Sequence, residues 1–140
     1  MEALAREQGW QRGVELGLGH GLLFARLVAL GIDMVGVDLG LKIERKRAVQ
    51  AIGGGQVHWM ATDAAAPLVP DGWADFVFID AGHSYRAVQS DIAHWLPKVK
   101  PGGWFGGHDY HPKFPGVIRA VDEAFGEAID LLPGFIWVRR

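Results

Sequence analysis

Short apolar runs alternate along the chain with segments whose apolar residues recur at helical spacing. The runs predict five strands, at Arg12–Leu16, Met34–Asp38, Gln56–Met60, Ala74–Asp80 and Trp104–His108. The intervening segments predict helices, at His20–Leu30, Leu41–Ile52, Ser84–Leu96 and Val117–Phe125. Two last runs, Ile129–Leu132 and Phe135–Val138, flank Pro133-Gly134 and predict a closing hairpin.

This alternation predicts an α/β fold, a doubly wound Rossmann-like sheet that is mostly parallel with one antiparallel strand from the hairpin. The 140 residues fit a single domain, residues 1–140. Ligands of such sheets bind beyond the carboxyl ends of the strands. Polar residues follow several predicted strand ends, and we expect them to share one edge: Asp38, Asp63, Asp80, His108 and Asp109.

A glycine-rich turn follows the first predicted strand, with glycines at Gly17, Gly19 and Gly21. Asp38 ends the second strand, 21 residues after Gly17, where a carboxylate can accept hydrogen bonds from both ribose hydroxyls. The layout predicts a site for a nucleoside-bearing cofactor; a tight turn without a ligand is the alternative. A dinucleotide motif would place its third glycine at Leu22, which argues against a nicotinamide-dependent oxidoreductase.

Composition narrows the classes of function. The net charge of −2 gives no general attraction to nucleic acid, so no nucleic-acid partner is expected. The chain has no cysteine, which excludes disulfides, thiolate metal ligands and a cysteine nucleophile. No apolar run approaches the ~20 residues of a membrane span, and the first residues lack a signal-peptide core. We therefore expect no membrane association and a cytoplasmic location.

Four phrases of the chain resemble one enzyme family. They are Ile79-Asp80-Ala81-Gly82-His83-Ser84-Tyr85, Leu96 to Gly103, Gly107-His108-Asp109-Tyr110, and Gly116 to Glu123. With the glycine turn they make the chain similar to class I S-adenosylmethionine-dependent methyltransferases, and more narrowly to small-molecule O-methyltransferases. The resemblance covers nearly the whole chain from residue 13 onward, and it implies a seven-stranded sheet whose last strand is antiparallel.

The resemblance also implies roles in cofactor binding. The three glycines would pass under the methionine part and the ribose, and Asp38 would hold the ribose diol. Asp63 would take the adenine amino group, unless it is a helix N-cap. Glu15 would orient the turn and the amino-acid end of the cofactor, unless it is a buried acid bonded to backbone amides. Leu39 would pack on the adenine face.

The ends of the fourth and fifth strands suggest a metal site. Neighbouring strands lie ~4.8 Å apart, so Asp80, His108 and Asp109 can converge on one ion. Oxygen ligands suit Mg²⁺, whereas a histidine favours Mn²⁺ or another transition ion. The alternative is that Asp80 and Asp109 only cap strand ends. His83 is the candidate general base, three residues after Asp80, and its alternative is a structural bond to the loop at residues 108–110.

Together these expectations predict methyl transfer to a hydroxyl of a small molecule. Catechol-like or vicinal diol acceptors are favoured, because two adjacent oxygens can chelate a metal ion. A module that binds the cofactor without efficient turnover is the alternative. Few residues precede the first strand, so this minimal core has little to cover an acceptor. A homodimer could supply that cover, with Trp10 and Trp104 as exposed interface anchors.

Overall fold

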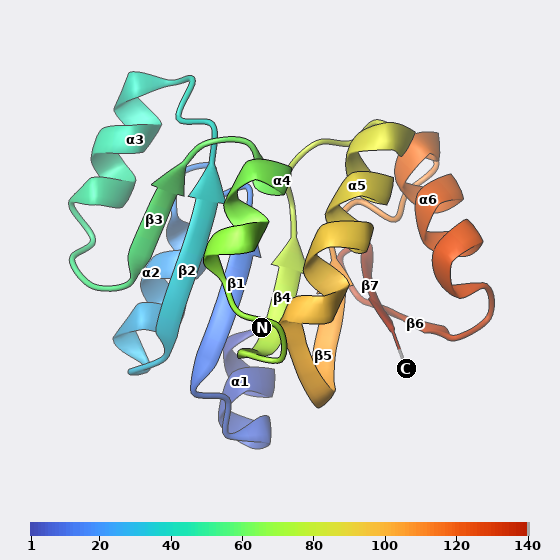
Figure 1. Cartoon of the computed structure of the whole chain (residues 1–140), viewed down its shortest axis with the longest axis horizontal. Helices are drawn as coiled ribbons and strands as arrows, with labels where there is room; N and C mark the ends of the chain where they lie inside the picture. Colours follow the sequence, from blue (N-terminus) through green and yellow to red (C-terminus); the bar gives the residue numbers. More distant parts are fainter. Residues whose placement is uncertain (140) are drawn as a thin grey trace.

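Seven strands form one sheet in the order β3-β2-β1-β4-β5-β7-β6 (Figure 1). The structure is a computed structural model, and it describes residues 1–139. The strands are β1 Arg12–Leu16, β2 Asp33–Asp38, β3 Gln56–Trp59, β4 Ala74–Ile79, β5 Val99–Gly107, β6 Ile129–Leu132 and β7 Ile136–Arg139. Neighbours from β3 to β5 pair in parallel, and β7 runs antiparallel to both β5 and β6. The predicted doubly wound, mostly parallel sheet is confirmed.

Helices cover both faces of the sheet, with α4, α5 and α6 in front of it in Figure 1 and α1 and α2 behind. The helices are α1 Glu2–Gln8, α2 Leu22–Ala29, α3 Ile43–Gln50, α4 Thr62–Ala65, α5 Tyr85–Trp95 and α6 Pro115–Phe125. One apolar core lies on each face: Trp95, Phe105 and Trp137 belong to the first, and Phe24 and Phe76 to the second. In residues 1–139, no helix is both long and apolar enough to span a bilayer.

Three elements differ most from the sequence-based expectation: helix α1, Glu2–Gln8, was not predicted, and β5 and α4 differ as follows. β5 begins at Val99, five residues before the predicted start at Trp104. Val99 pairs with Ala74 and Trp104 with Phe76, so a bulge takes up the extra residues of the Pro-Gly-Gly stretch, which the sequence suggested was only a lead-in. Helix α4 was not predicted, because four residues are too few to show helical periodicity.

The carboxyl edge of the sheet is held together beyond the strand ends. The backbone N–H of Asp80 donates to the carbonyl of Leu16 (2.7 Å), and that of His108 donates to the carbonyl of Ile79 (2.9 Å). These bonds fix the ends of β1, β4 and β5 relative to one another. The residues that follow these strands therefore start from a rigid frame.

Helix α5 starts directly after this edge. Ser84 caps it, its Oγ accepting from the N–H of Ala87 (3.3 Å). Val88, Ile92 and Trp95 form its buried stripe, and Asp91 is buried on the same stripe. The cap and the stripe together hold the short β4–α5 connection, which carries His83.

Candidate functional site

A cavity of about 520 Å³ lies at the carboxyl edge of the sheet, above β1, β2 and β4. Of the residues predicted for the site, six line it: Gly17, Gly19, Asp38, Leu39, Asp80 and His83. His108 and Asp109 line a small adjoining hollow that also reaches Asp80 and His83. Glu15, Gly21 and Asp63 line neither. The structure thus brings most of the predicted residues to one place.

Gly17 is required by a close approach between strands. Its φ is +84°, and a Cβ there would lie 2.1 Å from the carbonyl oxygen of Asp80. Gly21 serves a different purpose, since a Cβ there would meet the side chains of Val49 and Ile52 at 2.8 Å. Gly17 therefore lets the turn pass beside the end of β4, and Gly21 lets α2 pack against the segment of α3.

Asp38 ties the glycine turn to the end of β2. Its Oδ2 accepts from the N–H of Leu18 (3.0 Å) and of Gly19 (3.4 Å), and its Oδ1 accepts from the N–H of Gly40 (2.7 Å). A carboxylate has about four acceptor positions, so Asp38 can still receive a hydroxyl from the cavity. The same side chain shapes the turn and faces the space where a ligand fits.

Glu15 lies beneath the turn and is 4% exposed. Burial, and then the nearby carboxylates of Asp80 and Asp38, raise the pKa of Glu15 to about 8. Its Oε2 is buried and makes no hydrogen bond to any residue between 1 and 139. The alternative of a buried acid bonded to backbone amides therefore has no such bond at Oε2, and a buried carboxyl oxygen without a partner favours a cationic or proton-donating neighbour.

Asp63 is exposed and sits in the first turn of α4, with Oδ1 accepting from the N–H of Ala64 (2.8 Å). The N-cap of α4 is Ala61, so the alternative of Asp63 as the N-cap residue is wrong by two positions. Asp63 stabilises the first turn from inside it. Its proposed contact with adenine stays a prediction.

Asp91 lines the cavity, and sequence reasoning missed it. Its Oδ1 accepts a hydrogen bond from Oγ1 of Thr62 (2.5 Å). The available signal was an acidic residue on the apolar stripe of α5, at helical spacing from Val88 and Trp95. An acid in such a stripe is buried at a cost and needs a partner or a function.

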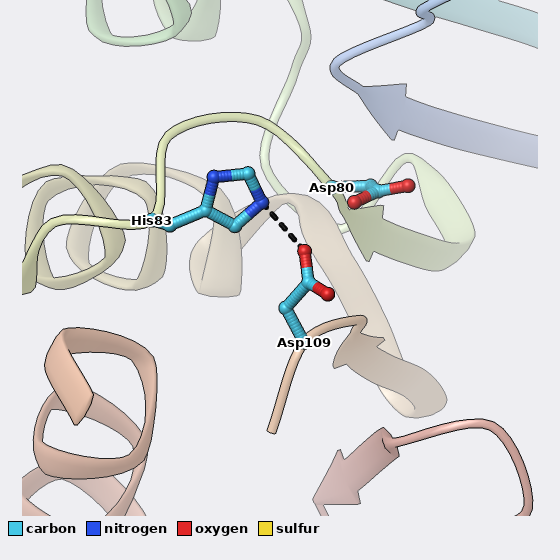
Figure 2. A group of neighbouring side chains, drawn as sticks. All are labelled: Asp80, His83 and Asp109. Atoms are coloured by element: carbon cyan, nitrogen blue, oxygen red, sulfur yellow. Dashed lines mark ion pairs between the residues drawn. The ribbon is translucent and has the colours of Figure 1, made fainter. Parts of the chain in front are cut away.

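Two carboxylates and two histidines meet where β4 and β5 end. Nε2 of His83 lies 2.5 Å from Oδ2 of Asp109, as the dashed line in Figure 2 marks. Nδ1 of His108 lies 3.1 Å from Oδ1 of Asp109 and 3.8 Å from Oδ1 of Asp80. Asp80, His108 and Asp109 are therefore neighbours, and His83 joins them through Asp109.

His83 is held from two sides. Asp109 binds one nitrogen, and the ring stacks on Phe114 with centroids 4.6 Å apart. In Figure 2 the second ring nitrogen points away from Asp109. The bond to Asp109 also satisfies the alternative of a structural contact with the loop at residues 108–110, and it does not conflict with a catalytic role. A histidine oriented by a carboxylate, with one nitrogen free, has the arrangement of a general base.

The cluster also has the chemistry of a metal site. One ligand atom each from Asp80, His83 and Asp109 lies within 4.8 Å of the others. Burial is the main cause that raises the pKa of Asp80 to about 6, and Asp109 adds to it, while His108 and His83 oppose it. A cation would relieve the proximity of the two carboxylates. This compact group contains His83 in place of the predicted His108. His108 lies next to the group and approaches the carboxylates of Asp80 and Asp109.

Comparison with known proteins identifies a family and similar folds. Residues 14–110 match the model of a methyltransferase domain family. Three of the solved structures that are similar to the chain illustrate the fold. CalS11, a TDP-rhamnose 3′-O-methyltransferase of calicheamicin biosynthesis, has a TM-score of 0.77 at 15% identity, with 99% of this chain and 76% of that one covered. No curated protein sequence matches significantly.

The other two structures were solved with S-adenosylhomocysteine (SAH) bound. An O-methyltransferase from Bacillus cereus has a TM-score of 0.69 at 16% identity, covering 99% and 78% of the two chains. The methyltransferase PaMTH1 from Podospora anserina has a TM-score of 0.73 at 15% identity, covering 99% and 75%. The family model spans more than half of the chain, and the sheet order and cavity agree with it. The chain therefore belongs to this methyltransferase family and has the fold of the class I S-adenosylmethionine-dependent enzymes.

Proposed function

We propose that the chain transfers the methyl group of S-adenosylmethionine to a hydroxyl of a small molecule. One observation carries this proposal: the cavity lined by the glycine turn and Asp38 also reaches Asp80 and His83. A cofactor bound along the turn would present its sulfonium to a carboxylate and an imidazole. O-methyltransferases among the similar structures support oxygen as the accepting atom.

The cofactor would lie along the carboxyl edge. Gly17 and Gly19 give it backbone contact without a Cβ, and Asp38 accepts from the ribose hydroxyls. Glu15 lies in β1 beneath the glycine turn, and its unpaired Oε2 would favour a nearby positive charge such as the ammonium group of the methionine part. Leu39 lines the cavity and is 58% exposed, which suits a side chain that packs on adenine.

His83 would accept the proton of the acceptor hydroxyl. Bound S-adenosylmethionine would supply a methyl group on a sulfonium; the acceptor oxygen would take the methyl carbon, and the electron pair of the broken carbon–sulfur bond would remain on sulfur in S-adenosylhomocysteine. The hydroxyl proton passes to the free nitrogen of His83, while Asp109 holds the ring. Alignment alone contributes roughly 7–11 kcal/mol in favourable cases, so positioning is the larger task of this site.

A divalent ion fits the donor set of the same cluster. Asp80 and Asp109 would hold it, with a histidine as third ligand, and this mixture of oxygen and nitrogen donors suits Mg²⁺ less well than Mn²⁺. When bound, such an ion lowers the pKa of a coordinated hydroxyl. His83 and His108 both reach Asp109, so one can serve as ligand while the other handles the proton.

Turnover with labelled S-adenosylmethionine tests the proposal. The acceptors should include catechols, sugar hydroxyls and nucleotide sugars, each with Mg²⁺, with Mn²⁺ and with a chelator. We expect a methylated product that depends on His83 and is lost in His83→Asn, while His94→Asn, a matched change on the exposed part of α5, keeps the activity. Cofactor binding without turnover on every acceptor would favour a binding module instead.

A separate variant, Asp80→Ala, tests whether the ion takes part in the reaction. Asp80→Ala should abolish any stimulation by metal and leave the affinity for SAH nearly unchanged. Activity that survives the chelator in the wild-type protein would contradict the metal assignment without affecting methyl transfer.

A homodimer remains part of the proposal. Trp10 and Trp104 are half-buried rather than exposed as expected, because Trp10 stacks on Phe76 (4.5 Å between centroids) and meets Trp104 at 5.8 Å. They line a hollow with Gly102 and Arg139. Light scattering after size-exclusion chromatography should give the mass of two chains, and a monomer at all concentrations would refute it.

A further inference from the structure

Asp91 is a buried carboxylate that the proposed reaction does not use. It is 2% exposed, yet it lines the cavity from α5 together with Ala87, one helical turn earlier. Its Oδ1 accepts from Oγ1 of Thr62 (2.5 Å), and Nε1 of Trp95 donates to the carbonyl of Thr62 (3.1 Å). Two side chains of α5 thus hold the first residue of α4 at the cavity wall.

This part of the wall lies on the β3 side of Asp38. Asp38 ends β2, and the neighbour of β2 at the edge of the sheet is β3. The residues directly after β3, Met60, Ala61 and Thr62, line the cavity. Leu39 and Leu41 also line it and are 58% and 84% exposed. A nucleoside whose ribose meets Asp38 would place its base among these apolar side chains, with Thr62 and Asp91 as the polar pair beside it.

The carboxylate of Asp91 can accept a second hydrogen bond in addition to the one from Thr62. Burial raises the pKa of Asp91 to about 6, the bond from Thr62 opposes that rise, and the carboxyl is therefore mostly ionised at pH 7.5. Its Oδ1 receives the Thr62 hydroxyl, and a carboxylate has about four acceptor positions in all. Because Asp91 lines the cavity, a ligand that brings an N–H there can donate to this carboxylate.

We propose that Asp91 accepts a hydrogen bond from the exocyclic amino group of adenine and so selects an adenine-bearing cofactor. The inference rests on the proposed binding of S-adenosylmethionine in this cavity. Hypoxanthine carries a carbonyl where adenine carries the amino group, and it would turn an acceptor toward the carboxylate. Asp91, buried and facing the cavity, takes the role that the resemblance gave to exposed Asp63.

Calorimetric titration with SAH and with S-inosylhomocysteine tests the proposal at pH 7.5. The preference of the wild-type protein for adenine is not diagnostic by itself, since other contacts can contribute to it. The diagnostic quantity is the ratio of the two dissociation constants in Asp91→Asn. An asparagine can offer its amide N–H to the hypoxanthine carbonyl, so we expect the ratio to fall by about tenfold or more relative to wild type.

The remaining outcomes are distinct. Equal weakening for both ligands in Asp91→Asn, with an unchanged ratio, would assign Asp91 a structural role and overturn the inference; melting temperatures measured in parallel report that role. A changed ratio in Asp63→Asn, but not in Asp91→Asn, would overturn it in favour of Asp63. Failure of the wild-type protein to bind SAH at all would refute the proposed cofactor site, and the inference with it.

Discussion

Nε2 of His83 and Oδ2 of Asp109 lie 2.5 Å apart, although the two residues are 26 positions apart in the sequence. The first residue follows β4 and the second follows β5, and the two strands are neighbours in the sheet. Asp109 has a φ of +64°, a left-handed conformation that aspartate and asparagine tolerate better than most residues. The backbone turn after β5 thus directs the carboxylate toward His83.

Asp109→Asn should therefore reduce kcat while preserving the backbone. The asparagine amide lacks the negative charge that stabilises a protonated His83 ring, and kcat should fall by up to about 10²–10⁴-fold, the range that a positioned general base supplies. The affinity for SAH should stay near that of wild type. Recovery of kcat at high Mn²⁺ would show instead that Asp109 acts mainly as a metal ligand.

Asp38→Ala should weaken cofactor binding by roughly 1.5–3 kcal/mol, because a charge-assisted hydrogen bond to the ribose is lost. Asp38 also accepts from the backbone of Leu18 and Gly40, so some loss of thermal stability is expected as well. Calorimetry with SAH, beside a melting curve of the empty protein, separates the two effects. An unchanged dissociation constant would refute the ribose contact.

Gly17→Ala should be far more disruptive than Gly19→Ala. Both glycines have positive φ, at +84° and +54°, so each alanine costs roughly 1–2 kcal/mol of backbone energy. At Gly17 the new Cβ would also collide with the carbonyl oxygen of Asp80, at 2.1 Å. At Gly19 no atom lies within 4 Å of the position of a new Cβ. Denaturant unfolding should show the larger loss for Gly17→Ala, and equal losses would contradict the close approach.

Glu15 should make stability depend on pH. Its pKa is raised from 4.5 to about 8 in the folded protein, so the folded state holds more protons than the unfolded state between these values. The contribution of Glu15 is therefore fully present below pH 4.5 and is lost as the pH rises toward 8. Asp91, with a pKa raised to about 6, acts in the same direction over a narrower range.

Glu15→Gln has the shape of the protonated acid and cannot ionise. Unfolding free energies measured from pH 5 to pH 8.5 should therefore fall less steeply in this variant than in wild type. Parallel curves for the two proteins would show that Glu15 is already ionised or otherwise paired. Repeating the series with S-adenosylmethionine should flatten the wild-type curve, because a cation near Glu15 favours its charged form.

The sequence by itself determined the architecture. Mainly apolar runs at Arg12–Leu16 and Ala74–Asp80 predicted strands within one residue of their bounds, because central parallel strands are covered on both faces and largely buried. Gly17 and Asp38 marked the edge of the sheet where the cavity lies, since a turn that approaches another strand closely excludes a Cβ. Local patterns of this kind record local constraints, and they were sufficient to indicate the fold and the family.

Only the tertiary structure decided which side chains meet. Sequence spacing placed Asp80, His108 and Asp109 together but could not show that His83 binds Asp109. It also missed Asp91 as a residue that lines the cavity, because the partner of Asp91 is Thr62, 29 residues away on another element. Contacts between side chains depend on how helices cross the sheet, and that packing is set by the whole chain rather than by any one motif.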